Sequence, residues 1–176
     1  MITVICTTHR PQNQTLRIVE KYHEILEELG EASEVFQMAE LPEDFMYNDS
    51  FGNRTETFED VIHRKIVPAR GLVIVAPEYN GSYPGIFKAF LDAVKPTVWK
   101  GKGIALVGVA TGRAGNLRGL DHLTDVMHHL RAEVFSMKVP ISRLNELIIE
   151  GEDGFEHTET VTVLQKQAKE FLNFLK

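Results

Sequence analysis

Short apolar segments alternate along the chain with longer segments in which apolar residues recur at helical spacing. The almost wholly apolar run at 71–76 is typical of a central parallel strand that helices cover on both faces. Four further segments predict strands, at 2–6, 33–38, 103–110 and 133–139. The pattern therefore predicts five strands.

Helical spacing fills the intervals between these strands. The predicted helices run from about residue 13 to Gly30 and over 55–67, 84–94, 116–130 and 158–174. Turn formers and aromatic residues at 41–54 predict a long connection instead. Regular alternation of strand and helix predicts an α/β fold, a three-layer sandwich with a five-stranded parallel sheet and helices on both faces. The length of 176 residues predicts a single domain, 1–176.

Composition narrows the class of protein. Hydrophobic residues make up 43% and charged residues 25%, which is typical of a globular chain with a proper core. A net charge of -6 disfavours nucleic acid as a partner, and the longest apolar run is too short to span a bilayer. The single cysteine, Cys6, excludes an intramolecular disulfide and fits a reducing compartment. We therefore expect a cytoplasmic protein without a membrane or nucleic-acid partner.

Three predicted loops follow the carboxyl ends of strands, and in parallel sheets ligands bind at these ends, where the strand order reverses. The loops are 7–15, 77–83 and 111–116, and all three are rich in polar and small residues. We expect them to converge on one ligand site.

The first loop, 7–15, lies before a helix N-terminus, where free backbone N–H groups and the helix dipole favour an anion. Hydroxyls of Thr8 and Thr15, the Asn13 amide and the Arg10 guanidinium add donors suited to a phosphate. The alternative is that these residues only cap the helix.

The second loop places two aromatic residues, an amide and glycines within one turn. Tyr79, Asn80 and Gly81 offer an apolar surface, polar edge groups and close backbone approach, which a flat heteroaromatic ring requires. A simple turn would explain the proline, asparagine, glycine and serine of this loop, but not the whole string of residues.

The string Pro-Glu-Tyr-Asn-Gly-Ser-Tyr-Pro-Gly-Ile-Phe-Lys-Ala-Phe-Leu-Asp at 77–92 resembles the signature of the NAD(P)H-dependent FMN reductase family. The first loop is similar to the family pattern Gly-Ser-x-Arg-x-x-Ser-x-Asn/Thr, with Arg10 at the arginine and Thr7 at the glycine. The third loop falls where the family usually has a Gly-Gly pair, and Asn116 stands at the second glycine.

The resemblance implies a flavodoxin-like fold with strand order 2-1-3-4-5. It places FMN across the strand ends, with its phosphate in the first loop and its ring against residues 77–81. The residues then expected to bind FMN are Thr8, Arg10, Asn13, Gln14, Thr15, Pro77, Glu78, Tyr79, Asn80, Gly81, Thr111, Gly112, Arg113, Gly115 and Asn116.

The activity that the resemblance implies is reduction of bound FMN by NADPH or NADH, followed by reduction of a small-molecule acceptor. This acceptor is a quinone, free flavin, azo compound, nitro compound or metal ion. No catalytic side chain is expected, because hydride passes from the nicotinamide directly to the flavin. The resemblance also implies a homodimer or homotetramer.

Two other functions fit the same fold. One is a flavodoxin-like electron carrier without nicotinamide activity, and the other is a binding module that has lost the flavin. The aromatics Phe45, Tyr47 and Phe51 either cover the flavin of a neighbouring subunit or fill the core of their own domain.

A metal site is not expected. His122, Asp125 and His129 share one face of a predicted helix, but exposed histidine and aspartate on a helix face are commonplace, and we interpret them as solvated.

Overall fold

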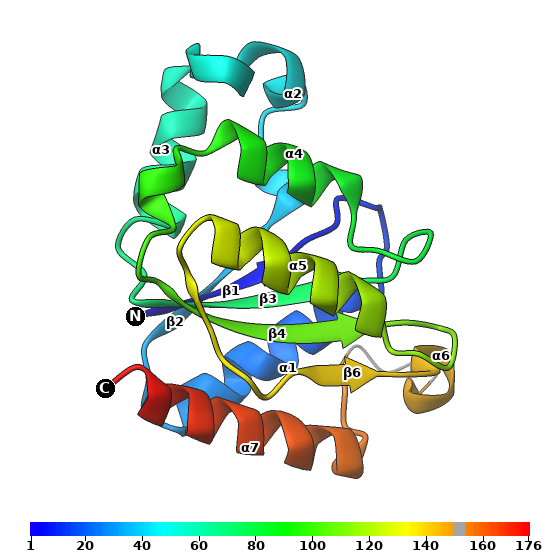
Figure 1. The fold of residues 1–176 in the computed structure, drawn as a ribbon. Helices are drawn as coiled ribbons and strands as arrows, with labels where there is room; N and C mark the ends of the chain where they lie inside the picture. The colour runs from blue at the N-terminus through cyan, green and yellow to red at the C-terminus, as the bar shows by residue number, and fades with distance from the viewer. Residues whose placement is uncertain (150–153) are drawn as a thin grey trace.

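The computed structural model describes residues 1–149 and 154–176 and contains one parallel sheet (Figure 1). Its strands, in spatial order, are β2 (Ser33–Gln37), β1 (Ile2–Cys6), β3 (Gly71–Pro77), β4 (Gly103–Val109), and the two edge segments β5 (Glu133–Val134) and β6 (Val139–Ile141). This is the strand order 2-1-3-4-5 of the flavodoxin-like fold, as predicted.

Helices cover both faces of the sheet, so the predicted three-layer sandwich is confirmed (Figure 1). The helices are α1 (Thr15–Glu28), α2 (Phe45–Asn48), α3 (Glu56–Lys65), α4 (Gly85–Ala93), α5 (Leu117–His129), α6 (Leu144–Leu147) and α7 (Thr158–Phe174). Helices α1 and α7 pack on one face, while α3, α4 and α5 pack on the other. The connection predicted at 41–54 contains α2 and a 3₁₀ turn at Ser50–Gly52.

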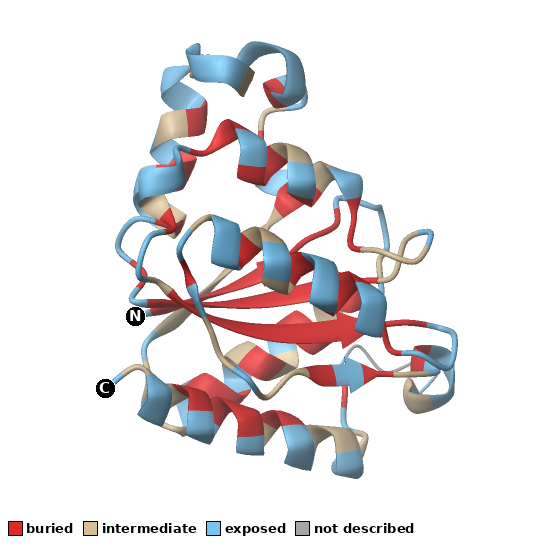
Figure 2. Cartoon of the chain, in the orientation of Figure 1, coloured by how far each residue is buried: buried red, intermediate tan, exposed pale blue. Residues whose placement is uncertain are grey.

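The central strand β3 is buried along its whole length, which explains why its sequence is almost wholly apolar (Figure 2). Val73 and Val75 join the core under α1 and α7, whereas Leu72 and Ile74 join the core under α3, α4 and α5. Alternate residues of one strand thus supply two separate cores.

Local signals set the helix boundaries. The Thr55 hydroxyl accepts a hydrogen bond from the backbone N–H of Phe58 and so caps α3. Gly30 adopts φ 75° just after α1, where the N–H groups of Gly30 and Glu31 donate to the last carbonyls of the helix. These positions agree with the predicted limits to within about two residues.

The fifth strand differs from the single segment predicted at 133–139. Between β5 and β6, four edge residues, 135–138, lie beside only two residues of β4, Ala105 and Leu106. Such an excess forms a bulge that interrupts the ladder. The buried Gln167 of α7 fills the gap, because its Nε2 donates to the carbonyls of Leu106 (3.1 Å) and Met137 (2.7 Å).

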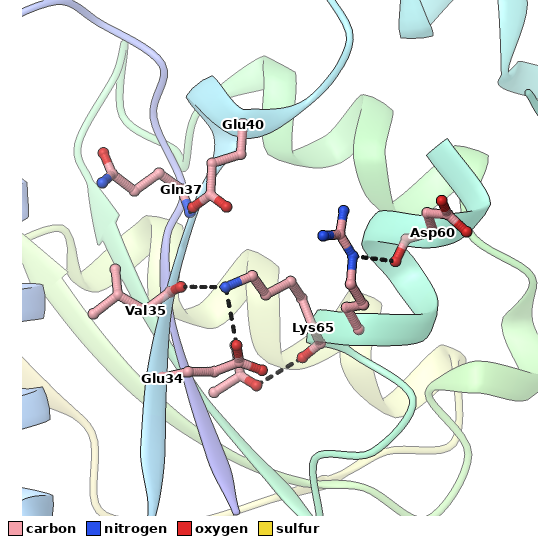
Figure 3. A network of polar contacts seen from close by, with 8 residues as sticks. Glu34, Val35, Gln37, Glu40, Asp60 and Lys65 are labelled. Carbon is pink, nitrogen blue, oxygen red and sulfur yellow. Dashed lines mark hydrogen bonds and ion pairs between the residues drawn. The ribbon is translucent and has the colours of Figure 1, made fainter. Parts of the chain in front are cut away.

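At the opposite edge of the sheet, side chains occupy polar groups of strand β2 (Figure 3). Lys65 of α3 donates from Nζ to the Glu34 carboxylate (2.9 Å) and to the Val35 carbonyl (3.1 Å). The Glu40 carboxylate accepts a hydrogen bond from the backbone N–H of Gln37 at 2.8 Å. Occupied groups of this kind hinder pairing with another strand.

Candidate functional site

The first loop is held by hydrogen bonds of a buried threonine and a half-buried asparagine. Thr7 is fully buried, and its Oγ1 donates to the Val75 carbonyl at 3.0 Å. Asn13 ties the loop together: its Oδ1 accepts from the Leu16 N–H (3.0 Å), and its Nδ2 donates to the Arg10 carbonyl (3.0 Å). Thr7 does not have a positive φ, so threonine satisfies the backbone at this position without strain.

The start of α1 has the features of an anion site. Within the described residues, the backbone N–H groups of Gln14 and Thr15 donate no hydrogen bond, and the first turn contains no acidic residue. Arg10, an exposed residue of the loop, forms no ion pair with any described residue. A helix N-terminus with free donors and an unpaired guanidinium favours a phosphate.

The second loop forms a tight turn over Tyr79–Ser82. Tyr79 and Ser82 exchange backbone hydrogen bonds (2.9 and 3.1 Å), and Asn80 and Gly81 have φ values of 51° and 79°. Positive φ at both central residues defines a type I′ turn, for which Asn-Gly is a preferred pair. The Tyr79 hydroxyl lies 2.7 Å from Thr8 Oγ1 and so connects this turn to the first loop.

The third loop packs closely on strands β4 and β6. A Cβ atom at Gly108 would lie 2.2 Å from the Gly115 carbonyl oxygen, so the loop needs glycine beneath it. The Gly112 carbonyl accepts from the Arg143 N–H, and the Arg113 carbonyl accepts from the Ser142 hydroxyl. These bonds hold the carbonyls, while the N–H groups of Thr111 and Gly112 donate to no described residue.

Asn116 closes this loop with a backbone in the left-handed region, φ 64° and ψ 31°. Its side chain is buried, and Nδ2 donates to the Ala76 carbonyl at the end of β3 (2.9 Å). Asparagine tolerates positive φ better than most residues with a side chain. This explains how asparagine can stand where the family pattern has glycine.

The three loops surround a cavity of about 390 Å³. Its lining consists of Arg10, Gln12, Asn13, Gln14, Thr15, Pro77, Glu78, Tyr79, Val109, Ala110, Thr111, Leu144 and Asn145. A second concavity of about 580 Å³ shares Arg10, Glu78 and Tyr79 with the first and adds His9, Pro11 and Asn80. Pockets for small aromatic ligands have volumes in this range.

The structure brings together most of the predicted binding residues, from all three loops. Eight line the first cavity, namely Arg10, Asn13, Gln14, Thr15, Pro77, Glu78, Tyr79 and Thr111. Asn80 lines only the second, while Thr8, Gly81, Gly112, Arg113, Gly115 and Asn116 line neither. Thr8 and Asn116 instead bond to neighbouring loops and strands, which gives them a supporting position.

Five cavity residues were not among those predicted: Gln12, Val109, Ala110, Leu144 and Asn145. Leu144 and Asn145 begin α6, which follows β6 and is tied to the third loop by the Leu144 N–H and the Ala110 carbonyl (3.0 Å). The sequence did contain a signal for Leu144 and Asn145. They follow the predicted fifth strand, and the loop after that strand also reaches the carboxyl edge of the sheet.

The described residues offer neither a reactive cysteine nor a metal site. Burial raises the pKa of the Cys6 thiol to about 11, so this cysteine is an inert thiol under the first loop. Across residues 1–149 and 154–176, no group of three His, Cys, Asp or Glu side chains is placed to hold a metal. Over the same ranges, no helix has the length and apolar character needed to cross a membrane.

These residues fit FMN on their own chemistry. The free N–H groups at the start of α1 and the Arg10 guanidinium suit a phosphate. Pro77, Tyr79 and Val109 offer apolar surface for a ring, and the free N–H of Thr111 can donate to a ring carbonyl. Phosphate donors and a ring surface therefore line the same cavity.

The fold and the site thus define a flavodoxin-like protein in which donors suited to an anion and apolar surface suited to a flat ring line one cavity. The model of the NADPH-dependent FMN reductase family matches residues 1–145, and the chain belongs to this family. The resemblance found in the sequence is confirmed.

Individual proteins similar to this chain are named as reductases or oxidoreductases. A 2-hydroxy-1,4-benzoquinone reductase from Burkholderia sp. is 35% identical over 89 residues, which cover 48% of this chain and 49% of that protein. The match thus spans about half the length of this relative. An NADPH azoreductase from Bacillus sp. (strain OY1-2) is 25% identical, covering 99% of this chain and 94% of that one. The solved structure of FerB, an NAD(P)H:(acceptor) oxidoreductase from Paracoccus denitrificans, shares the fold at a TM-score of 0.77, with 21% identity and coverage of 99% and 96%.

Proposed function

We propose that this protein is an NAD(P)H-dependent oxidoreductase that holds FMN and reduces a small aromatic acceptor, a quinone or an azo compound. The observation that supports this proposal most directly is the cavity, in which free donors at the start of α1 lie beside apolar surface, in a chain of the FMN reductase family. The two acceptor classes are those named for the Burkholderia and Bacillus relatives.

When bound, FMN supplies the redox chemistry, accepting hydride from the nicotinamide and passing electrons to the acceptor. The residues of the chain bind the cofactor and orient it. Arg10 and the N–H groups of Gln14 and Thr15 hold the phosphate, while Pro77 and Tyr79 support the ring. No side chain needs to move a proton in the first half-reaction, since hydride transfer depends on the alignment of two rings.

The test is the visible absorption spectrum of the purified protein supplemented with FMN, recorded before and after anaerobic addition of NADPH. We expect a flavin band that NADPH bleaches and that a quinone or azo dye restores. A band that NADPH leaves unchanged would favour the electron carrier, and an absence of bound flavin would overturn the proposal.

Arg10→Ala separates cofactor retention from chemistry. Loss of a charged phosphate contact should weaken FMN affinity by about tenfold to a hundredfold and leave turnover at saturating FMN within about twofold. The FMN dissociation constant is measured by flavin fluorescence quenching. Arg64→Ala, an exposed arginine of α3, is the matched control, and equal affinities in both variants would contradict the role of Arg10.

We also infer that copies of this chain associate into a homodimer or homotetramer. Phe45 fills its own core and stacks on Phe58, with ring centroids 5.7 Å apart. By contrast, Tyr47 and Phe51 are 90% and 97% exposed. Exposed aromatic residues close together in the sequence are typical of interfaces. Light scattering on the parent and on a Tyr47→Ser, Phe51→Ser double variant tests this, and a monomeric parent would contradict it.

A further inference from the structure

The Tyr79–Ser82 turn is joined to helix α5 by two side chains on one helix face. His122 Nδ1 lies 2.9 Å from Ser82 Oγ, and Arg118 Nη2 lies 3.8 Å from the Glu78 carboxylate. Arg118 and His122 are four residues apart, so both face the turn from successive turns of the helix. Neither residue lines either cavity.

The turn itself needs no help to keep its shape. Two backbone hydrogen bonds and the Asn80-Gly81 pair already fix a type I′ conformation. These bonds do not determine where the turn lies between the first loop and α5. The Thr8–Tyr79 contact fixes it on one side, and the contacts of Ser82 and Glu78 fix it on the other.

The placement of Arg118 is unusual for a helix. It lies in the first turn of α5, where the helix dipole disfavours a cation, and its side chain is 76% exposed. Its guanidinium nevertheless lies along the turn, since a Cβ atom at Gly81 would be 3.8 Å from Arg118 Nε and Nη2. Contact with the turn, and with the carboxylate beside it, accounts for this position.

We propose that Arg118 and His122 are positioning residues that hold the ring-binding turn against α5, so that FMN affinity depends on side chains outside the cavity. His122 acts through Ser82, and Arg118 acts through Glu78 and Gly81. The proposal rests on the proposed function, because it assumes that the ring lies against residues 77–81.

The test is a double-mutant cycle on Ser82 and His122, with FMN affinity measured by fluorescence quenching. Ser82→Ala and His122→Leu should each weaken FMN binding about fivefold, as expected for one lost hydrogen bond. The double variant should be no weaker than either single variant, since both remove the same contact. His122→Asn, which can bond to Ser82, should stay within about twofold of the parent. His128→Leu, the same change at an exposed position later on α5, should have no effect.

Additive losses in the cycle, or a His122→Leu variant that behaves like His128→Leu, would overturn the proposal. Amide hydrogen exchange without FMN gives a second measurement. The Glu78 N–H, which donates to the Val109 carbonyl at 2.8 Å and so joins the start of the turn to β4, should exchange several-fold faster in His122→Leu than in His128→Leu, and equal rates would also overturn the proposal. A parent that binds no FMN but shows the exchange difference would overturn the proposed function, while the contact of His122 with the turn would still be supported.

Discussion

Asn116 contributes to the third loop in two ways, through its backbone conformation and through its side chain. Its backbone adopts the left-handed conformation that closes the third loop, and its amide bonds to the end of β3. A glycine at this position would meet only the first requirement, and an alanine would meet neither. The residue therefore connects the loop to the strand on which the second loop begins.

Substitutions at Asn116 should separate these two contributions. We expect Asn116→Gly to lower the free energy of unfolding by about 1 kcal/mol, through loss of the hydrogen bond to Ala76. Asn116→Ala should lower it by about 2 kcal/mol or more, because the strain of positive φ is added. Urea denaturation measures both values, and an alanine variant as stable as the glycine variant would contradict this account.

At the scale of elements, the interrupted fifth strand depends on one side chain of α7. Gln167 donates to the Leu106 carbonyl of β4 and to the Met137 carbonyl of the bulge, and so joins the two. We expect Gln167→Leu to lower the free energy of unfolding by about 2–3 kcal/mol, since the two hydrogen bonds from α7 to these carbonyls would be lost. Gln165→Leu on the same helix is the control, and equal shifts in urea denaturation midpoint would contradict the bridging role.

The third loop lies so close to β4 that a single methyl group should displace it. In Gly108→Ala the new Cβ would meet the Gly115 carbonyl, which is backbone, whereas in Gly103→Ala it would meet a terminal methyl group of the Leu175 side chain, which can rotate away. We expect Gly108→Ala to cost about 1–3 kcal/mol and to weaken FMN binding, and Gly103→Ala to cost less and to leave FMN binding unchanged. Thermal unfolding and FMN titration compare the two.

The sequence predicted the layers and the three loops well, because buried parallel strands have nearly continuous apolar sequences, such as residues 71–76. It did not predict the break after Val134, since that break is satisfied by Gln167 from a helix about thirty residues later. The cavity wall formed by Leu144 and Asn145 was missed for a related reason. Helix α6 is a single turn, too short for a periodic pattern.

At the scale of the whole molecule, a cofactor that binds only the folded state stabilises all of it. At a concentration one hundred times its dissociation constant, FMN should add about 2.7 kcal/mol to the free energy of unfolding. Riboflavin, which lacks the phosphate, should raise the melting temperature much less than FMN at the same concentration. Equal shifts in a thermal melt would show that the first loop does not hold a phosphate.

The occupied edge of β2 has a consequence for how copies of this chain meet. Lys65 and Glu40 already bond to the Val35 carbonyl and the Gln37 N–H, so another chain cannot extend the sheet there without displacing both. A self-association that uses the helices or loops instead would give closed, symmetric particles where its contacts are self-complementary. Lys65 and Glu40 therefore hinder open-ended growth of the sheet from this edge.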